Sequence, residues 1–239
     1  VSIDGDSALV GAYQDDDMGS GSGSAYVFVR SGSTWTQQAK LTASDGYSSD
    51  YFGYSVGICG NYAIVGALGD DDLGSSSGSA YIFQNTAGGW VQQAKLTASD
   101  GYSGDDFGLS VAISGDTAIV GARDDDDHGT DSGSAYIFQR SGDLWLMQDK
   151  LTASDGYSDD EFGYAVGISG DTAIVGSRYD DDKGSNSGSA YIFQRSGTVW
   201  SEQIKLTPSD GASGDLFGHS VAVSGRVSIV GALDDDDNG

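Results

Sequence analysis

Short runs of alternating apolar and polar residues, separated by Gly, Ser and Asp, follow one another along the whole chain. In the clearest copy they cover residues 110–114, 117–120, 134–139 and 145 to about 152, and Gly121 ends the second run. Runs of this length, rich in β-branched and aromatic residues, are typical of strands. Helical spacing is absent, and the 38 glycines would penalise helices. The pattern therefore predicts an all-β fold with four short strands per unit.

The same unit recurs at a constant step of 55 residues, without insertion or deletion. The step is set by Trp35, Trp90, Trp145 and Trp200, and the Phe-Gly and Gly-Ala (or Gly-Ser) pairs keep it. One tandem-repeat domain therefore covers residues 1–239, divided into 1–55, 56–110, 111–165, 166–220 and the partial unit 221–239.

Four strands in one such unit match the size of a propeller blade. A single blade cannot cover both of its faces, so the recurring Tyr-Ile-Phe and Trp positions are expected to pack between neighbouring blades. We therefore predict a β-propeller built from four-stranded blades, with an open stacked β-repeat array as the alternative. The front hairpin occurs five times and the back one four times, so we expect either a window on a longer array or a hairpin that completes a neighbouring molecule's blade.

The repeated residues resemble a known family. Phe52-Gly53-Tyr54-Ser55-Val56 followed by Ala63-Ile64-Val65-Gly66-Ala67 is similar to the FG-GAP repeat of integrin α-chain propellers, and residues 107–122 resemble its bacterial branch. The resemblance implies a β-propeller that serves extracellular adhesion or recognition, not catalysis. Two features depart from the family. The Pro that often follows Gly-Ala is missing, and the link between the first two strands is too tight for the calcium loop that integrins carry there.

An acidic loop follows the second strand of every unit. Three adjacent Asp residues and a Gly two positions later recur in all five copies, as in Asp125-Asp126-Asp127-His128-Gly129. Calcium takes six to eight oxygen ligands in flexible geometry, so the first and third Asp are candidate ligands. These are Asp15, Asp17, Asp70, Asp72, Asp125, Asp127, Asp180, Asp182, Asp235 and Asp237. Capping of the loop turns by Asp, or solubility alone, are the alternative interpretations.

A second pair of Asp residues precedes each Phe-Gly, as in Asp100 and Asp105. We expect this pair to bond the backbone amides of the loop that crosses to the next blade, and ion binding is the less favoured interpretation.

Charge and rare residues limit the classes of function. The net charge of −25 disfavours nucleic acid and anionic lipid as partners, and no apolar run is long enough to insert into a membrane. His128, His219 and Cys59 each occur in a single copy of the unit, so we expect no catalytic site and no enzyme.

Two non-catalytic functions remain. The first is an extracellular or cell-surface structural and adhesive repeat, with a surface filament or coat as its assembled form. Its partners would be neighbouring copies of itself or further repeats of the same chain. The alternative is a recognition module that binds glycan or protein through loops, as a lectin-like or integrin-like propeller does.

Overall fold

The computed structural model describes residues 1–236, and this part of the chain contains strands and loops without any helix. Four antiparallel sheets have four strands each, and a fifth has two. Blade 1 contains β1 (Ser2–Asp4), β2 (Ser7–Ala12), β3 (Ser24–Ser31) and β4 (Thr34–Leu41). Blade 2 contains β5 (Val56–Cys59), β6 (Tyr62–Ala67), β7 (Ser79–Thr86) and β8 (Gly89–Leu96). Blade 3 contains β9 (Ser110–Ser114), β10 (Thr117–Ala122), β11 (Ser134–Ser141) and β12 (Leu144–Leu151). Blade 4 contains β13 (Phe162–Ser169), β14 (Thr172–Ser177), β15 (Ser189–Ser196) and β16 (Val199–Leu206), and blade 5 contains β17 (Phe217–Ser224) and β18 (Val227–Ala232).

The predicted strands are confirmed, with small shifts at their ends. The first strand of the third unit has the predicted bounds, whereas β10 continues through Gly121 to Ala122, because these residues still pair with Ala135 and Ser134 of β11. The tight turn predicted between the first two strands is also present. Gly115 occupies it with a φ of 59°, a conformation that glycine adopts without strain.

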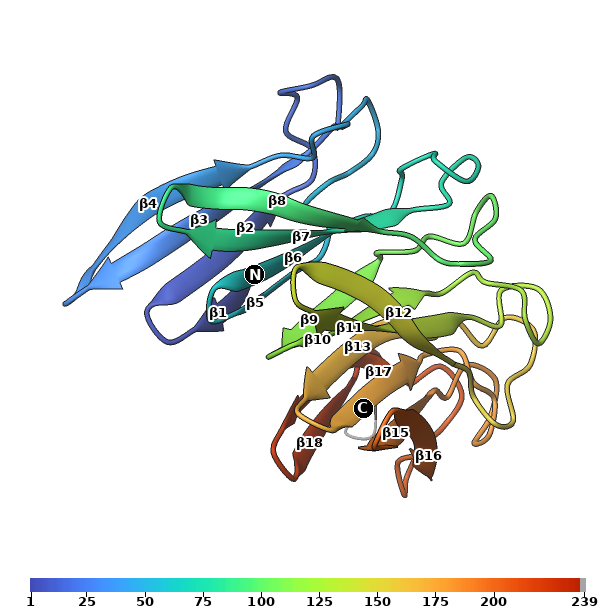
Figure 1. Cartoon of the computed structure of the whole chain (residues 1–239). Helices are drawn as coiled ribbons and strands as arrows, with labels where there is room; N and C mark the ends of the chain where they lie inside the picture. The colour runs from blue at the N-terminus through green and yellow to red at the C-terminus, as the bar shows by residue number, and fades with distance from the viewer. Residues whose placement is uncertain (237–239) are drawn as a thin grey trace.

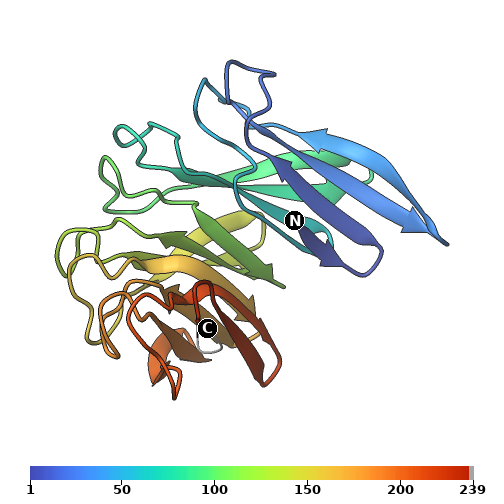
Figure 2. The same cartoon turned by 180° about the vertical axis from the view of Figure 1, so that it is seen from behind.

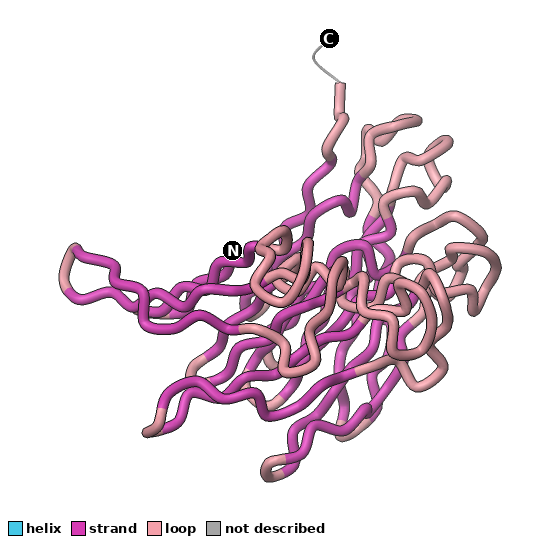
Figure 3. The backbone as a smooth tube through the Cα atoms, turned by 90° about the horizontal axis from the view of Figure 1, so that it is seen from above, coloured by secondary structure: helices cyan, strands magenta, loops and turns pink. Residues whose placement is uncertain are grey.

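The sheets follow one another as the blades of a β-propeller do. Each blade is a meander, and the first strands β5, β9, β13 and β17 lie side by side, whereas the outermost strands β8, β12 and β16 touch at few points. The blades therefore fan out from their first strands along an arc, with blade 1 and blade 5 at its two ends (Figures 1 and 2). The long loops lie on one side of the fan and the short hairpin turns on the other (Figure 3). No helix of the described chain is long and apolar enough to cross a membrane.

The core lies between the blades. In the layer between blades 2 and 3, Ile82 of blade 2 packs in one cluster with Phe107, Tyr136 and Trp145 of blade 3. Phe107 is fully buried, and its ring meets that of Tyr136 edge-to-face at 5.4 Å between centroids. The Trp145 indole donates to the side-chain oxygen of Gln93 in blade 2 over 2.8 Å. The layers on either side repeat this arrangement, so the predicted filling by Tyr, Ile, Phe and Trp is confirmed.

The repeated glycines hold the blades close together at the level of the backbone. A Cβ on Gly121 of blade 3 would lie 2.0 Å from the carbonyl oxygen of Gly163, which opens blade 4. Gly163 itself has a φ of 94°, and a Cβ there would lie 2.2 Å from the carbonyl oxygen of Ser134. The Gly of Gly-Ala and the Gly of Phe-Gly are therefore two halves of one contact between successive blades.

Candidate functional site

In the acidic loops of blades 1 to 4, the three Asp residues have different tasks. In blade 3, Asp125 points inward, with 4% of its surface exposed, and accepts hydrogen bonds from the hydroxyls of Ser134 and Tyr136. Asp126 accepts the backbone N–H of Asp131 over 2.9 Å and so caps the loop turn. Asp127 lies at the surface and pairs with Lys150. The capping interpretation thus holds for the middle residue and also for Asp125, which accepts the backbone N–H of Asp127 over 3.3 Å. Asp125 and Asp127 in addition face a basic side chain.

That basic side chain is a lysine of the fourth strand, and it connects the predicted loop residues in four blades. In blade 2, the Nζ of Lys95 lies 2.9 Å from Oδ2 of Asp70 and 2.5 Å from Oδ2 of Asp72. It also lies 2.9 Å from Oδ2 of Asp45, in the segment that links blade 1 to blade 2. The corresponding pairs are Lys40 with Asp15 and Asp17, Lys150 with Asp100, Asp125 and Asp127, and Lys205 with Asp155, Asp180 and Asp182.

The structure thus brings together the predicted residues of blades 1 to 4, but around an ammonium group. Asp235 belongs to the fifth copy, and Asp237 lies outside the described residues. Among residues 1–236, no group of three or more His, Cys, Asp or Glu side chains has an arrangement suited to a metal ion. Calcium at these loops stays a prediction, and the donor set as it stands fits an ammonium better, because lysine and tyrosine already bind the inward-facing oxygens.

The sequence analysis missed the lysine, although its signal is in the chain. Four of the five lysines keep the 55-residue step: Lys40, Lys95, Lys150 and Lys205. A cation repeated as strictly as the carboxylates indicates that the two belong together.

The Asp pair before each Phe-Gly divides its work. Asp45, Asp100 and Asp155 bind the lysine and the tyrosine hydroxyl of the following blade. The second member caps the crossing loop, as predicted: Asp105 accepts the backbone N–H of Tyr102 over 2.6 Å. Burial raises the pKa of Asp50, Asp105 and Asp160 to about 6. Burial also acts on Asp45, Asp100 and Asp155, but the bound lysine outweighs it and lowers their pKa.

These shifts predict how stability depends on pH. The buried carboxyls of Asp50, Asp105 and Asp160 bind protons more tightly in the folded chain than in the unfolded chain, whose Asp pKa is about 3.9. Their contribution to stability is therefore complete below about pH 4 and is lost as the pH rises through about 6. The free energy of unfolding should rise on acidification from pH 7 to pH 5. It should fall again below about pH 4, where the lysine-bound carboxylates take up protons.

Thermal unfolding followed by circular dichroism across this range measures the effect. Asp105→Asn should reduce the slope between pH 7 and pH 5 without removing it, because Asp50 and Asp160 still contribute. Asp143→Asn, at an exposed position with the same change of charge, should leave the slope intact. If the melting temperature of the wild type stays level or falls when the pH is lowered from 7 to 5, these three carboxyls do not have the raised pKa assigned to them.

A second candidate site lies where the copies of the repeat differ. Three columns of the repeat vary strongly in chemistry, and we call their residues the variable face. The first column follows the second strand and contains Tyr13, Leu68, Arg123, Arg178 and Leu233. The other two lie at the start of the next blade: one contains Tyr51, Asp106, Glu161 and Leu216, and the other contains Tyr54, Leu109, Tyr164 and His219. Although distant in sequence, members of the three columns lie together across blades 1, 2 and 3 around a pocket of about 250 Å³.

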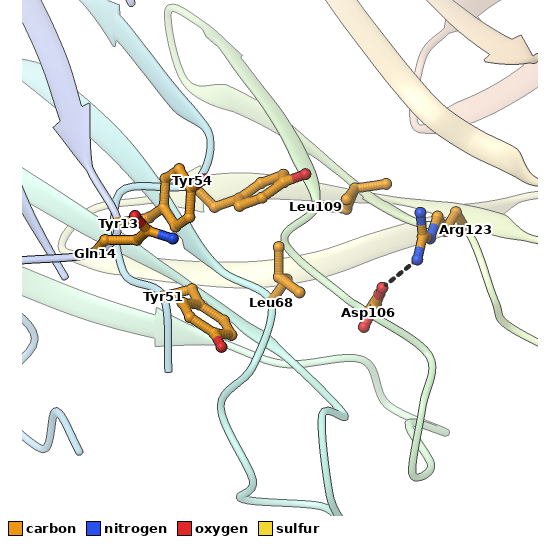
Figure 4. A pocket seen from close by; sticks show the side chains of 8 residues that line it. All are labelled: Tyr13, Gln14, Tyr51, Tyr54, Leu68, Asp106, Leu109 and Arg123. Atoms are coloured by element: carbon orange, nitrogen blue, oxygen red, sulfur yellow. Dashed lines mark hydrogen bonds and ion pairs between the residues drawn. The ribbon is translucent and has the colours of Figure 1, made fainter. Parts of the chain in front are cut away.

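Tyrosine rings form one end of this pocket (Figure 4). The ring of Tyr13 meets those of Tyr51 and Tyr54 edge-to-face, at 6.0 and 5.2 Å between centroids. Tyr13 and Tyr54 still expose 40% and 47% of their surface. The other end carries the ion pair of Arg123 and Asp106, 2.9 Å apart.

The face continues over blade 4 as a row of stacked groups. The guanidinium of Arg178 lies 3.8 Å from the ring centroid of Tyr164 and pairs with Glu161 over 2.7 Å. The ring of His219 also lies near Tyr164, 5.1 Å away between centroids. The variable face thus carries aromatic and charged side chains from blade 1 to blade 5.

The backbone of one variable column is strained. Tyr51, Asp106, Glu161 and Leu216 all adopt a φ between 52° and 56°, which glycine adopts far more readily than other residues. Two positions earlier, the φ is also positive, and glycine occupies that column in two copies, Gly104 and Gly214. No copy has glycine in the strained column of the variable face. The side chains there are retained at a cost of order 1 kcal/mol each.

These features define a class: a tandem-repeat β-propeller whose repeated residues hold the blades together and in which three unrepeated columns share one face. The profile of the FG-GAP repeat matches residues 1–28, 35–83, 90–138, 145–193 and 200–239. The chain therefore belongs to the FG-GAP repeat family, as its resemblance implied. Propellers of this family are typically non-catalytic and occur in extracellular or surface proteins.

Other comparisons add little. A search of curated proteins finds no match. Among solved structures, the chain is similar to that in the crystal structure of the Saccharomyces cerevisiae Sqt1, with 11% identity and a TM-score of 0.42. The match covers 67% of this chain and 37% of that one.

Proposed function

We propose that this chain is a non-catalytic recognition module of an extracellular or cell-surface protein, and that it binds a protein ligand at the variable face. One observation carries the proposal. The repeated Phe, Tyr and Trp residues pack between the blades, whereas three of the columns that differ between copies meet around a pocket lined by three tyrosines. A surface that serves recognition needs such differences, and blade packing does not.

The chemistry of the face favours a protein ligand over a glycan. Tyr and Arg are the residues enriched at the energetic centres of protein interfaces, and the half-buried Leu68 adds apolar surface beside them. The net charge of −25 also speeds the approach of a basic partner, and this attraction weakens as the salt concentration rises. The positive φ of Tyr51 supports the same function, because a residue kept in a strained conformation is often one whose side chain is used.

Selection from a random peptide library displayed on phage, with a glycan array in parallel, tests the proposal. We expect basic peptides to be enriched on the wild-type chain and to lose at least tenfold in affinity with Tyr54→Ala, because a buried interface tyrosine contributes about 2 kcal/mol or more. Tyr51→Gly should also abolish binding while the melting temperature holds, since glycine relieves the backbone strain.

Tyr102→Ala is the matched control, because Tyr102 is 75% exposed and does not line the pocket. Peptide binding that is unchanged by Tyr54→Ala, or hits on the glycan array alone, would refute a protein ligand at this face.

The structural and adhesive array remains a second candidate. The three inter-blade layers are closely alike, and such layers can stack without closing into a ring. Regular fibres of the purified chain in negative stain would favour this function, with copies of the chain or further repeats as partners.

A further inference from the structure

We infer that the ammonium of the repeated lysine is the resident cation of the acidic loops of blades 2 to 4, so that these loops take no calcium while the lysine is in place. The geometry of blade 2 shows the match of donors to acceptors. An ammonium has three N–H donors. The Nζ of Lys95 meets three carboxylates, those of Asp45, Asp70 and Asp72, at 2.5 to 2.9 Å. Each donor thus has one charged acceptor.

The remaining contacts of the site also suit an ammonium better than calcium. The hydroxyl of Tyr81 lies 2.8 Å from Oδ2 of Asp70 and 3.0 Å from Oδ1 of Asp45, so that its one proton is shared between two oxygens that a metal would need. The ring of Tyr81 lies 5.3 Å from the Nζ of Lys95, within the range of a cation–π contact. Calcium requires six to eight oxygens, and with the lysine in place the side chain of Asp70, 5% exposed, leaves little surface for the waters that would complete its shell.

The arrangement recurs, which separates it from a chance contact at the surface. In blades 3 and 4, the Nζ atoms of Lys150 and Lys205 each contact three carboxylates at 2.6 to 3.1 Å, and the hydroxyls of Tyr136 and Tyr191 lie within 2.9 Å of two of them. The lysine side chains of blades 2 to 4 are 15 to 18% exposed. The flanking carboxylates raise the pKa of Lys95 despite its burial, so it stays charged at neutral pH.

The lysine also holds separate segments of the chain together, as a bound calcium ion would. Asp45 belongs to the segment between blades, whereas Asp70 and Asp72 belong to the loop of blade 2, so the ammonium links blade 2 to the segment that enters it from blade 1. Without it, three carboxylates would face one another with no cation between them and repel. Such a set of oxygens, once vacated, is one that calcium can bind.

Thermal unfolding of the full chain, with calcium chloride in the millimolar range or with excess EDTA, tests the inference. The melting temperature of the wild type should be the same in both. Lys95→Met should lower it by roughly 5–10 °C in EDTA, because a largely buried group of carboxylates loses its partner. Calcium should then restore part of the loss. Lys183→Met, the same substitution at the lysine outside the repeated column, should change neither value.

Titration of the wild type with calcium in a calorimeter gives a result that does not depend on any variant being folded. The fifth loop has no lysine of the repeated column in this chain, so micromolar binding of more than one calcium ion per chain, or a wild-type melting temperature that falls in EDTA, would overturn the inference. So would a Lys95→Met chain that calcium does not stabilise. Peptide binding at the variable face is read separately, so either proposal can fail alone.

Discussion

Gly121→Ala is expected to destabilise the chain by about 3 kcal/mol, at the upper end of the cost of overpacking, and to lower its melting temperature by roughly 6–12 °C. The added methyl would lie 2.0 Å from the carbonyl oxygen of Gly163 and 2.4 Å from the hydroxyl oxygen of Ser110. The serine side chain can rotate, but the carbonyl belongs to the backbone of the next blade. Blades 3 and 4 must therefore separate to make room.

The matched control is Gly115→Asn. Gly115 has a φ of 59° in a turn where a Cβ meets no atom within 4 Å, and asparagine tolerates that conformation better than other residues. Differential scanning calorimetry of both variants measures the difference. If Gly121→Ala melts no lower than Gly115→Asn, the close approach of the two backbones does not hold the blades together.

Phe107→Ala is expected to cost about 3–5 kcal/mol, the usual range for removing a fully buried aromatic ring. The ring packs edge-to-face on Tyr136 and Phe138 in the layer between blades 2 and 3. Its loss opens a cavity that neither sheet can fill, since each is held by its own hydrogen bonds. Urea unfolding measures the loss of free energy, and hydrogen exchange should show the largest loss of protection at β5 to β12.

Tyr102→Ala serves as the control here too, because most of that ring already lies in water. Equal losses of stability in the two variants would argue against the inter-blade layer as the source of stability. If protection is lost evenly over all blades, including blade 1, the destabilisation is not confined to the layer between blades 2 and 3.

The sequence carried most of the information about the fold. Period and alternation predicted the strands, and the Tyr, Phe and Trp columns predicted the layers, because packing between identical units requires the same side chains in each copy. Gly121 was expected to end its strand, yet β10 continues through it. A glycine in a strand also permits the close approach of another backbone, and the sequence alone does not show which segment of the chain packs against it.

The candidate sites were harder to predict, for two physical reasons. The partner of Asp70 is Lys95, which lies two strands further along the sheet, so no local spacing reveals the pair. The variable face was missed because columns that differ between copies contribute nothing common to the fold. Tyr13, Tyr54 and Arg123 come together only once the blades stack at a fixed angle.

The backbone contact between Gly-Ala of one blade and Phe-Gly of the next has a further consequence. The contact involves residues that every copy shares, so any blade can follow any other. Loss or duplication of a whole 55-residue segment by recombination would leave each junction intact. Propellers of different sizes can thus arise from one gene in single steps, each with a new order of residues on its binding face.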